Sequence, residues 1–392
     1  MLTASLAHEI ACENAAVTGL GILITDRDGE VIGSSDPKRL GTCHEASLEV
    51  VRTREPASHT ARQAAALHGV KPGLTLPILV DGEAVGTVGI TGSPARVRRF
   101  GPLVRRHTEI LLRESATLRS QLLLEAGIED LIRDIASFDP EVIESAALVA
   151  RARELGYTLD VPRIAIVFAV SAETGGGRTP RRDASVLRAE LVRVIRERFA
   201  DADDIVAAST PGRFVVLHRL RRYSPGPTDV ATTANCAAIV EAVRVRYSLP
   251  LRAAVGGVGA KLMELRLAMQ DASDAMLLAA KVAPTATTYT IRELRPHQLL
   301  SSAGHRARSR LIATELTELR AQGDWEQLRT TLIAWCEAGF NLVAASARLH
   351  IHRNTLIYRI AKIEQITGRS LRDHAACITT YLACLADQVE ES

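Results

Sequence analysis

Two closely spaced helical segments near the C-terminus restrict the fold of this 392-residue chain more than any other feature. Asp324 is a good N-cap for a preceding helix that ends near Gly339, and Asn341 is a good N-cap for the first of the two segments. The three-residue turn His350–His352 separates it from the second segment, Arg353–Gly368. Two linked helices of which the second is longer and basic are typical of a helix-turn-helix.

The second helix has one apolar face and a polar remainder. Leu356, Ile360 and Ile363 repeat at helical spacing, so we expect this face to be buried. Between residues 341 and 374 six Lys and Arg stand against two acidic residues, a local balance of +4, whereas the whole chain carries +3. Periodicity alone also allows an ordinary helical hairpin with a solvated basic face. The residues predicted to bind DNA are His352, Arg353, Asn354, Thr355, Tyr358, Arg359 and Lys362.

Length and composition bound the remaining possibilities. A chain of 392 residues suggests two or three domains, and 47% hydrophobic with 24% charged residues is typical of a globular protein. Six dispersed cysteines without a C-x-x-C pair argue against a disulfide framework or structural zinc, and no metal or cofactor is predicted. Neither a signal peptide nor an apolar run of about 18 residues is present, so a cytoplasmic protein without membrane association is expected.

The first hundred residues follow the pattern of a small α+β domain. Two pairs of apolar runs flank the turns Asp26–Gly29 and Asp81–Gly82, and each pair predicts a β-hairpin. Helical segments lie between the hairpins, which indicates a sensor-like domain with an antiparallel sheet.

A long helix is expected over Phe100–Ile135. A seven-residue register, interrupted at Glu125, contains Val104, Leu111, Leu118 and Ile132. Such a register suits a dimerising or signalling helix, and it equally suits an ordinary helix packed on its own domain.

A second α+β unit begins with the apolar strand Arg163–Val170. After a Gly/Arg/Pro-rich loop at Thr174–Arg182, helices alternate with strands, including a hairpin around Pro211–Gly212. This order favours a cyclase-like or ferredoxin-like α/β sandwich. From Pro296 the chain is almost entirely helical, and we place the last domain boundary there.

The middle unit lacks the residues of an enzyme. Gly256-Gly257-x-Gly259 has neither the lysine of a P-loop nor the spacing of a dinucleotide fingerprint, and favours a strand that ends in small residues. The hairpin Thr210–Phe214 lacks the Gly-Gly-Asp/Glu-Glu-Phe string that positions nucleotide and metal in cyclases. Because no nucleophile with a base, metal cluster or carboxylate pair emerges elsewhere, no enzymatic activity is predicted.

The string His352-Arg-Asn-Thr-Leu-x-Tyr358-Arg, continued to Gly368, closely resembles the helix-turn-helix of the sugar diacid regulator (CdaR) family and of the related purine-catabolism (PucR) regulators. Segments Gly29–Glu45, Leu67–Pro77 and Gly82–Gly92 look like the sugar-diacid recognition domain of the same family. Departures from the usual pattern occur at Ala46, Ser47, Pro72 and Thr75.

The resemblance implies a multidomain α+β architecture. It comprises a PAS/Cache-like sensor with its signalling helix at 1–135, a degenerate GGDEF-like α/β domain at 136–295 and an all-α helix-turn-helix domain at 296–392. It also implies a ligand-responsive regulator, expected to activate genes for the use of glucarate, galactarate or glycerate. The alternative is a purine- or amino-acid-catabolism regulator with the same DNA-binding end. At least a dimer is expected, since one helix-turn-helix reads only a half-site.

A carboxylated ligand needs cationic donors, hydroxyls and backbone N–H groups, and a turn expected at Gly73–Thr75 could supply some of them. Arg39 is favoured because its planar fork matches a carboxylate, whereas Lys71 also suits a solvent-facing lysine and His44 a structural histidine. Cys43–His44 with His59 or His68 matches no usual metal spacing. The residues predicted to bind the ligand are Ser35, Arg39, His44, Lys71, Gly73, Leu74, Thr75 and Thr91.

Overall fold

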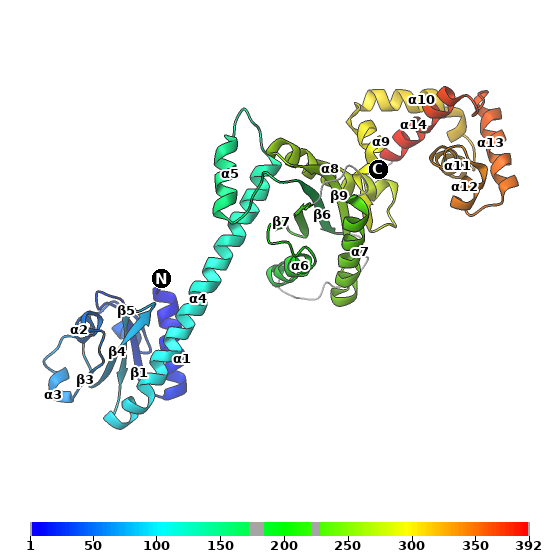
Figure 1. The fold of residues 1–392 in the computed structure, drawn as a ribbon. Coiled ribbons are helices and arrows are strands. Elements are labelled where there is room, and N and C mark those ends of the chain that lie inside the picture. The colour runs from blue at the N-terminus through cyan, green and yellow to red at the C-terminus, as the bar shows by residue number, and fades with distance from the viewer. Residues whose placement is uncertain (1, 172–183, 222–227, 391–392) are drawn as a thin grey trace. The chain divides into compact units, whose positions relative to one another are not determined.

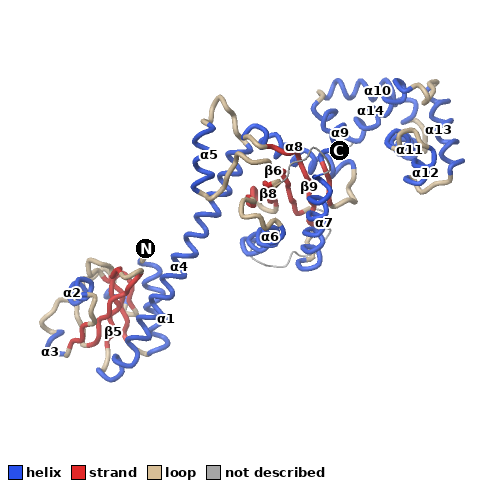
Figure 2. Tube along the Cα trace, in the orientation of Figure 1, coloured by secondary structure: helices blue, strands red, loops and turns tan. Residues whose placement is uncertain are grey.

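The computed structural model describes residues 2–171, 184–221 and 228–390. The chain forms two compact units, residues 1–124 and 125–392 (Figures 1 and 2). The loop predicted at Thr174–Arg182 lies outside the described residues. Among the described helices, none is long and apolar enough to span a bilayer.

The first unit is a five-stranded antiparallel sheet of order β2-β1-β5-β4-β3 with helices on both faces. Both predicted hairpins are confirmed, as β1–β2 and β4–β5. The second closes through Asp81 and Gly82, whose φ angles of 51° and 83° suit a tight hairpin turn. The elements are α1 (Ala4–Thr18), β1 (Gly21–Thr25), β2 (Val31–Ser34), the 3-10 helix η1 (Pro37–Arg39), α2 (Glu45–Thr53), β3 (Ala57–His59), α3 (Ala61–Ala64), β4 (Gly73–Val80), β5 (Glu83–Thr91) and α4 (Pro94–Ala136).

The helix predicted from Phe100 is longer than expected, because α4 begins at Pro94 and contains 43 residues. Near its start Val97, Val104 and Leu112 are buried in the core of the first unit. Near its end Ile128, Leu131, Ile132 and Ile135 are buried in the core of the second unit. Leu118 is 58% exposed between these stretches, so the seven-residue register does not form one buried face.

The middle of the chain has the predicted order of elements. Its sheet, β10-β9-β6-β8-β7, is antiparallel except for the parallel pair β9–β10. The glycines at the end of β9 allow close packing of the strand against α8, because a Cβ on Gly256 would lie 2.3 Å from the carbonyl oxygen of Ala268 in that helix. The elements are α5 (Ser145–Glu154), β6 (Arg163–Val170), α6 (Ala184–Arg198), β7 (Ile205–Thr210), β8 (Arg213–Arg219), α7 (Thr228–Tyr247), β9 (Leu251–Gly259), α8 (Leu262–Val282) and β10 (Thr288–Thr290).

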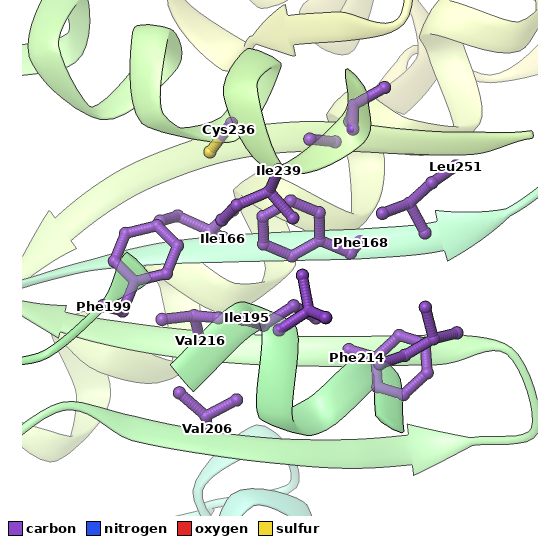
Figure 3. Packing of buried hydrophobic residues seen from close by; sticks show 14 of the residues in the cluster. Ile166, Phe168, Ile195, Phe199, Val206, Phe214, Val216, Cys236, Ile239 and Leu251 are labelled. Carbon is purple, nitrogen blue, oxygen red and sulfur yellow. The ribbon is translucent and has the colours of Figure 1, made fainter. Parts of the chain in front are cut away.

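Each face of this second sheet buries its own core. On one face Phe168, Phe214 and Ile166 pack against Ile195 and Ile239 from helices α6 and α7 (Figure 3). The other face packs against α5, α8 and the end of α4. The alternation of side chains along each strand therefore builds a three-layer domain.

The last part of the chain is helical, as predicted. The boundary residue Pro296 lies inside α9. Helix α14 packs against α10 and α11 in the C-terminal core, and Val389 near its end reaches the cluster around α8 and α9. The elements are α9 (Ile291–Ser302), α10 (His305–Arg320), α11 (Trp325–Glu337), α12 (Leu342–Arg348), α13 (Arg353–Thr367) and α14 (His374–Glu390).

Candidate ligand site and nucleic-acid interface

Some of the predicted ligand residues, among them Thr75 and Thr91, lie on the face of the first sheet that is turned away from α1 and α4. Val88 and Ile90 of β5 point into the core with those helices, so Thr87 and Gly89, which alternate with them, lie on the other face. Helix α2 packs against β4 and β5 on that face, on the side of the sheet opposite α1 (Figure 1). Thr75 pairs with Gly89 and belongs to the same face.

A chain of hydrogen bonds runs across this face from His44, which is only 3% exposed. His44 Nδ1 lies 2.7 Å from Ser47 Oγ, Ser47 Oγ lies 2.6 Å from Thr87 Oγ1, and Thr87 Oγ1 lies 2.9 Å from Thr25 Oγ1. The Thr25 hydroxyl donates to the carbonyl of Asp26 at 3.1 Å.

The Asp26 carbonyl, at the end of this series of hydrogen bonds, determines which atom donates in each of them. A hydroxyl has one proton, and the Asp26 carbonyl only accepts, so Thr25 gives its proton to Asp26 and accepts from Thr87. Thr87 then accepts from Ser47, and Ser47 accepts from His44. The imidazole therefore carries its proton on Nδ1, and Nε2 of the neutral ring is an acceptor.

Charge reinforces this state of the imidazole. Burial, together with the positive charges of Arg39 and His59, lowers the pKa of His44 from its usual 6.5 to about 4. His44 is therefore neutral at pH 7. In this state Nε2 can accept a hydrogen bond but cannot donate one to a carboxylate.

Arg39 supplies the positive charge beside His44. Arg39 is the last residue of η1, whose N-cap Asp36 accepts from the backbone N–H of Lys38 at 3.3 Å. The Nη2 of Arg39 donates to the carbonyl of Gly69. Gly69 has φ +68°, and a Cβ there would lie 2.0 Å from the carbonyl oxygen of Cys43. Burial lowers the pKa of Arg39 and Asp36 opposes this shift, so the guanidinium remains charged.

The other predicted ligand residues differ from one another in exposure and in their hydrogen-bond partners. Lys71 Nζ lies 3.4 Å from Asp36 Oδ2, and both side chains are about half exposed. The Ser35 hydroxyl is engaged with the backbone of Ile22, from which it accepts at 3.0 Å. Thr91 pairs with Gly73 at the edge of the polar face.

One expectation at this site is wrong. Residues Gly73–Thr75 were predicted to form a turn, but they begin strand β4 because they pair with both β5 and β3. Leu74 packs its side chain against the core, so only its backbone faces a neighbouring strand. Their N–H groups belong largely to the sheet ladder.

Sequence reasoning missed the polar partners Ser47 and Thr87, and also His59. The run Thr87-x-Gly89-x-Thr91 was a usable signal, because alternation places all three opposite the apolar Val88 and Ile90. Within the ranges that the structure describes, no three His, Cys, Asp or Glu side chains form a metal-binding group.

The helix-turn-helix geometry is set by local caps. Asn341 Oδ1 accepts from the backbone N–H groups of Val343 and Ala344 at 2.9 and 3.1 Å, which starts α12 as predicted. His352 is the N-cap of α13, and its Nδ1 accepts from the N–H of Asn354 at 3.2 Å. His352 therefore caps the N-terminus of α13.

The inner face of α13 is also confirmed. Leu356 and Ile363 are 0% and 1% exposed, and Ile360 packs beside Ile363 in the C-terminal core. This packing fixes which side of the helix stays open. The exposed residues of α13 include Arg353, Asn354, Thr355, Tyr358, Ala361 and Gln365.

Two of the predicted DNA-binding residues are engaged with α11. Arg359 donates to Gln327 Oε1 at 2.8 Å, and Lys362 Nζ lies 2.7 Å from Asp324 Oδ1. Asp324 stands at the start of α11 but makes no capping bond with its side chain, contrary to the sequence prediction. Its carboxylate bonds to Lys362 instead, and this bond lowers the pKa of Asp324.

Neighbouring helices also neutralise part of the local positive charge. Arg348 pairs with Glu337 of α11, and Arg369 lies 2.6 Å from Glu315 of α10. These acids lie outside the segment whose charge was counted as +4. The segment from 341 to 374 is therefore less basic in the fold than the sequence count indicates.

Three family models match this chain. Residues 2–135 match the putative sugar diacid recognition family, residues 140–278 the GGDEF-like domain, and residues 328–386 the PucR C-terminal helix-turn-helix domain.

Similar proteins extend over nearly the full length. The carbohydrate diacid regulator of Escherichia coli (strain K12) is 26% identical over 388 residues, 99% of this chain and 98% of that protein. The uncharacterized protein YsfB of Bacillus subtilis (strain 168) is 23% identical over 96% of both chains. The purine catabolism regulatory protein of the same organism is 25% identical over 142 residues, 36% of this chain and 27% of that protein.

Proposed function

We propose that this chain, a ligand-responsive transcriptional regulator similar to the carbohydrate diacid regulators, binds a hydroxylated carboxylic acid in its N-terminal domain and promoter DNA through α13. The observation that carries the proposal is that the charged Arg39 lies near enough to the neutral, buried His44 to help lower its pKa. We propose a PAS/Cache-like sensor at 1–135, a degenerate GGDEF-like domain at 136–295 and a helix-turn-helix domain at 296–392. The strand order of the first sheet supports the sensor assignment.

The two groups suit different parts of such a ligand. The planar fork of Arg39 matches a carboxylate, with Lys71 adding positive charge near the exposed edge. Nε2 of His44 accepts a hydrogen bond from a ligand hydroxyl. Glucarate, galactarate and glycerate each carry both groups, and they are the proposed inducers.

Calorimetry on the full chain tests this assignment. We expect glucarate, galactarate or glycerate to bind, and adipate, which has the two carboxylates of glucarate but no hydroxyls, to bind at least tenfold more weakly. Arg39→Ala should abolish binding, whereas Lys38→Ala, which removes an exposed charge one residue away, should not. Equal binding of adipate would contradict the role of His44, and unchanged binding by Arg39→Ala would place the pocket elsewhere.

A regulator of purine or amino-acid catabolism is the second candidate, favoured by the partial match to the purine catabolism regulatory protein. Binding of allantoin in place of the sugar acids would support it. In either case we propose a non-enzymatic activator that acts on promoter DNA in the cytoplasm. A homo-oligomer is proposed because useful specificity requires two half-sites, and light scattering that shows a monomer on its operator would contradict this.

A further inference from the structure

A cavity of about 400 Å³ lies in the second unit, where the end of α4, the hairpin β7–β8 and α8 meet. Its α4 wall consists of Glu129, Ile132, Arg133 and Ala136, which share one face of that helix by their spacing. Met269 of α8 and Val215 of β8 add apolar surface, and the volume is within the range of small-molecule pockets.

Arg213 gives this cavity an uncompensated positive charge. Its side chain is half-buried at the tip of the hairpin, and its Nη2 is fully buried without a hydrogen-bond acceptor among the described residues. No described carboxylate pairs with this guanidinium, which belongs to the cavity lining, so an anion held in the cavity would compensate its charge.

The rest of the lining donates more than it accepts. Arg266 Nη1 donates a hydrogen bond to the carbonyl of Phe138 at 2.9 Å, which holds the guanidinium of Arg266 at the wall of the cavity. The one carboxylate among the lining residues, Glu129, already bonds to Arg188. The remaining polar groups of the lining are the hydroxyls of Ser209, Thr210 and Ser273, the amide of Gln270 and the guanidinium of Arg133.

We propose that this cavity binds a small organic anion, a carboxylate or phosphate monoester with an apolar body. Arg213 and Arg266 would bind its charged group, and Ile132 and Met269 would contact its apolar body. None of these residues belongs to the sensor site, so the inference goes beyond the proposed function. Because four lining residues belong to α4, the anion acts on the same helix that leaves the sensor domain, which gives the regulator a second input.

Thermal unfolding and calorimetry of the full chain, with phenyl phosphate, benzoate and inorganic phosphate at constant ionic strength, test the proposal. We expect saturable 1:1 binding of phenyl phosphate or benzoate, and the tighter of the two identifies the anion class. Inorganic phosphate, which lacks the apolar body, should bind more weakly. Arg213→Met should weaken binding at least tenfold, and Arg213→Lys should retain part of it.

Two controls separate a ligand site from a structural arginine. Arg246→Ala removes an equal charge from the exposed surface of α7 and should bind the anion like the parent. Without anion, Arg213→Met should unfold at the same temperature as the parent or higher, because the buried unpaired nitrogen is gone. The proposal is wrong if Arg213→Met binds both organic anions like the parent, or if neither stabilises the parent more than sodium chloride does at equal ionic strength.

Discussion

The basic residues of α13 divide into two sets, and replacing a member of each should affect different properties. Arg353 is exposed at the start of the helix, and its side chain makes no hydrogen bond or ion pair within the described residues. Lys362 is bonded to Asp324 of α11, with the two side chains 28% and 34% exposed. We therefore compare Arg353→Ala with Lys362→Ala.

The expected magnitudes differ in kind. A good contact from an arginine to a base is worth about 1 to 3 kcal/mol, so Arg353→Ala should weaken operator binding about 5- to 150-fold and leave folding stability unchanged. A partly exposed ion pair contributes about 0 to 1 kcal/mol, so Lys362→Ala should slightly lower the stability of the C-terminal domain and change DNA affinity less than Arg353→Ala does.

Fluorescence anisotropy with an operator selected by the parent chain from random DNA measures the affinities, and urea unfolding measures the stabilities. Arg310→Ala, an exposed arginine of α10, controls for the loss of one charge. A greater loss of DNA affinity in Lys362→Ala than in Arg353→Ala would refute the division. Parent-like affinity in the double variant Arg353→Ala/Tyr358→Ala would refute the assignment of α13 as the recognition helix.

Other predictions concern the two cores and the sensor site. Since the pKa of His44 falls from 6.5 to about 4, the unfolded chain binds the extra proton, so urea unfolding should show about 3 kcal/mol of N-terminal stability lost from pH 7 to 4, and less in His44→Gln. Ser47→Ala removes the acceptor of Nδ1–H, so ¹⁵N spectra should show a shift of the His44 proton toward Nε2 and sugar-acid binding should weaken. Leu356→Ala should cost about 2 to 5 kcal/mol of C-terminal stability in denaturant unfolding, because Leu356 is fully buried. Gly69→Ala should lower the melting temperature of the N-terminal domain, because its Cβ would clash with the carbonyl of Cys43.

Features set by neighbouring residues could be predicted from the sequence. The Asp81–Gly82 hairpin, the Asn341 cap and the buried stripe of α13 depend on backbone preferences and helical spacing within about one turn. The order of strands and helices in the middle domain follows from similar local signals.

Features that depend on distant partners could not be predicted. Asp324 is a residue type that often caps helices, but its carboxylate bonds to Lys362, 38 residues later. Gly73–Thr75 resembles a turn, yet pairing with β3 extends the sheet to it. The position of the His44 proton on Nδ1 depends on Thr87 and Thr25, whose positions beside Ser47 arise only when β1, β5 and α2 come together.

The second unit also contains a continuous series of contacts between the end of α4 and α13. The end of α4 shares a core with α8, and Lys281 of α8 donates to the carbonyl of Val389 in α14 at 2.9 Å. Asp387 of α14, 1% exposed at its side chain, pairs with Arg329 of α11 at 2.9 Å, and α11 holds α13 through Arg359 and Lys362. Close-packed interiors transmit strain, so a ligand that favours one arrangement of α4 by about 1 to 3 kcal/mol would act on α13 through packed helices, without a flexible linker between them.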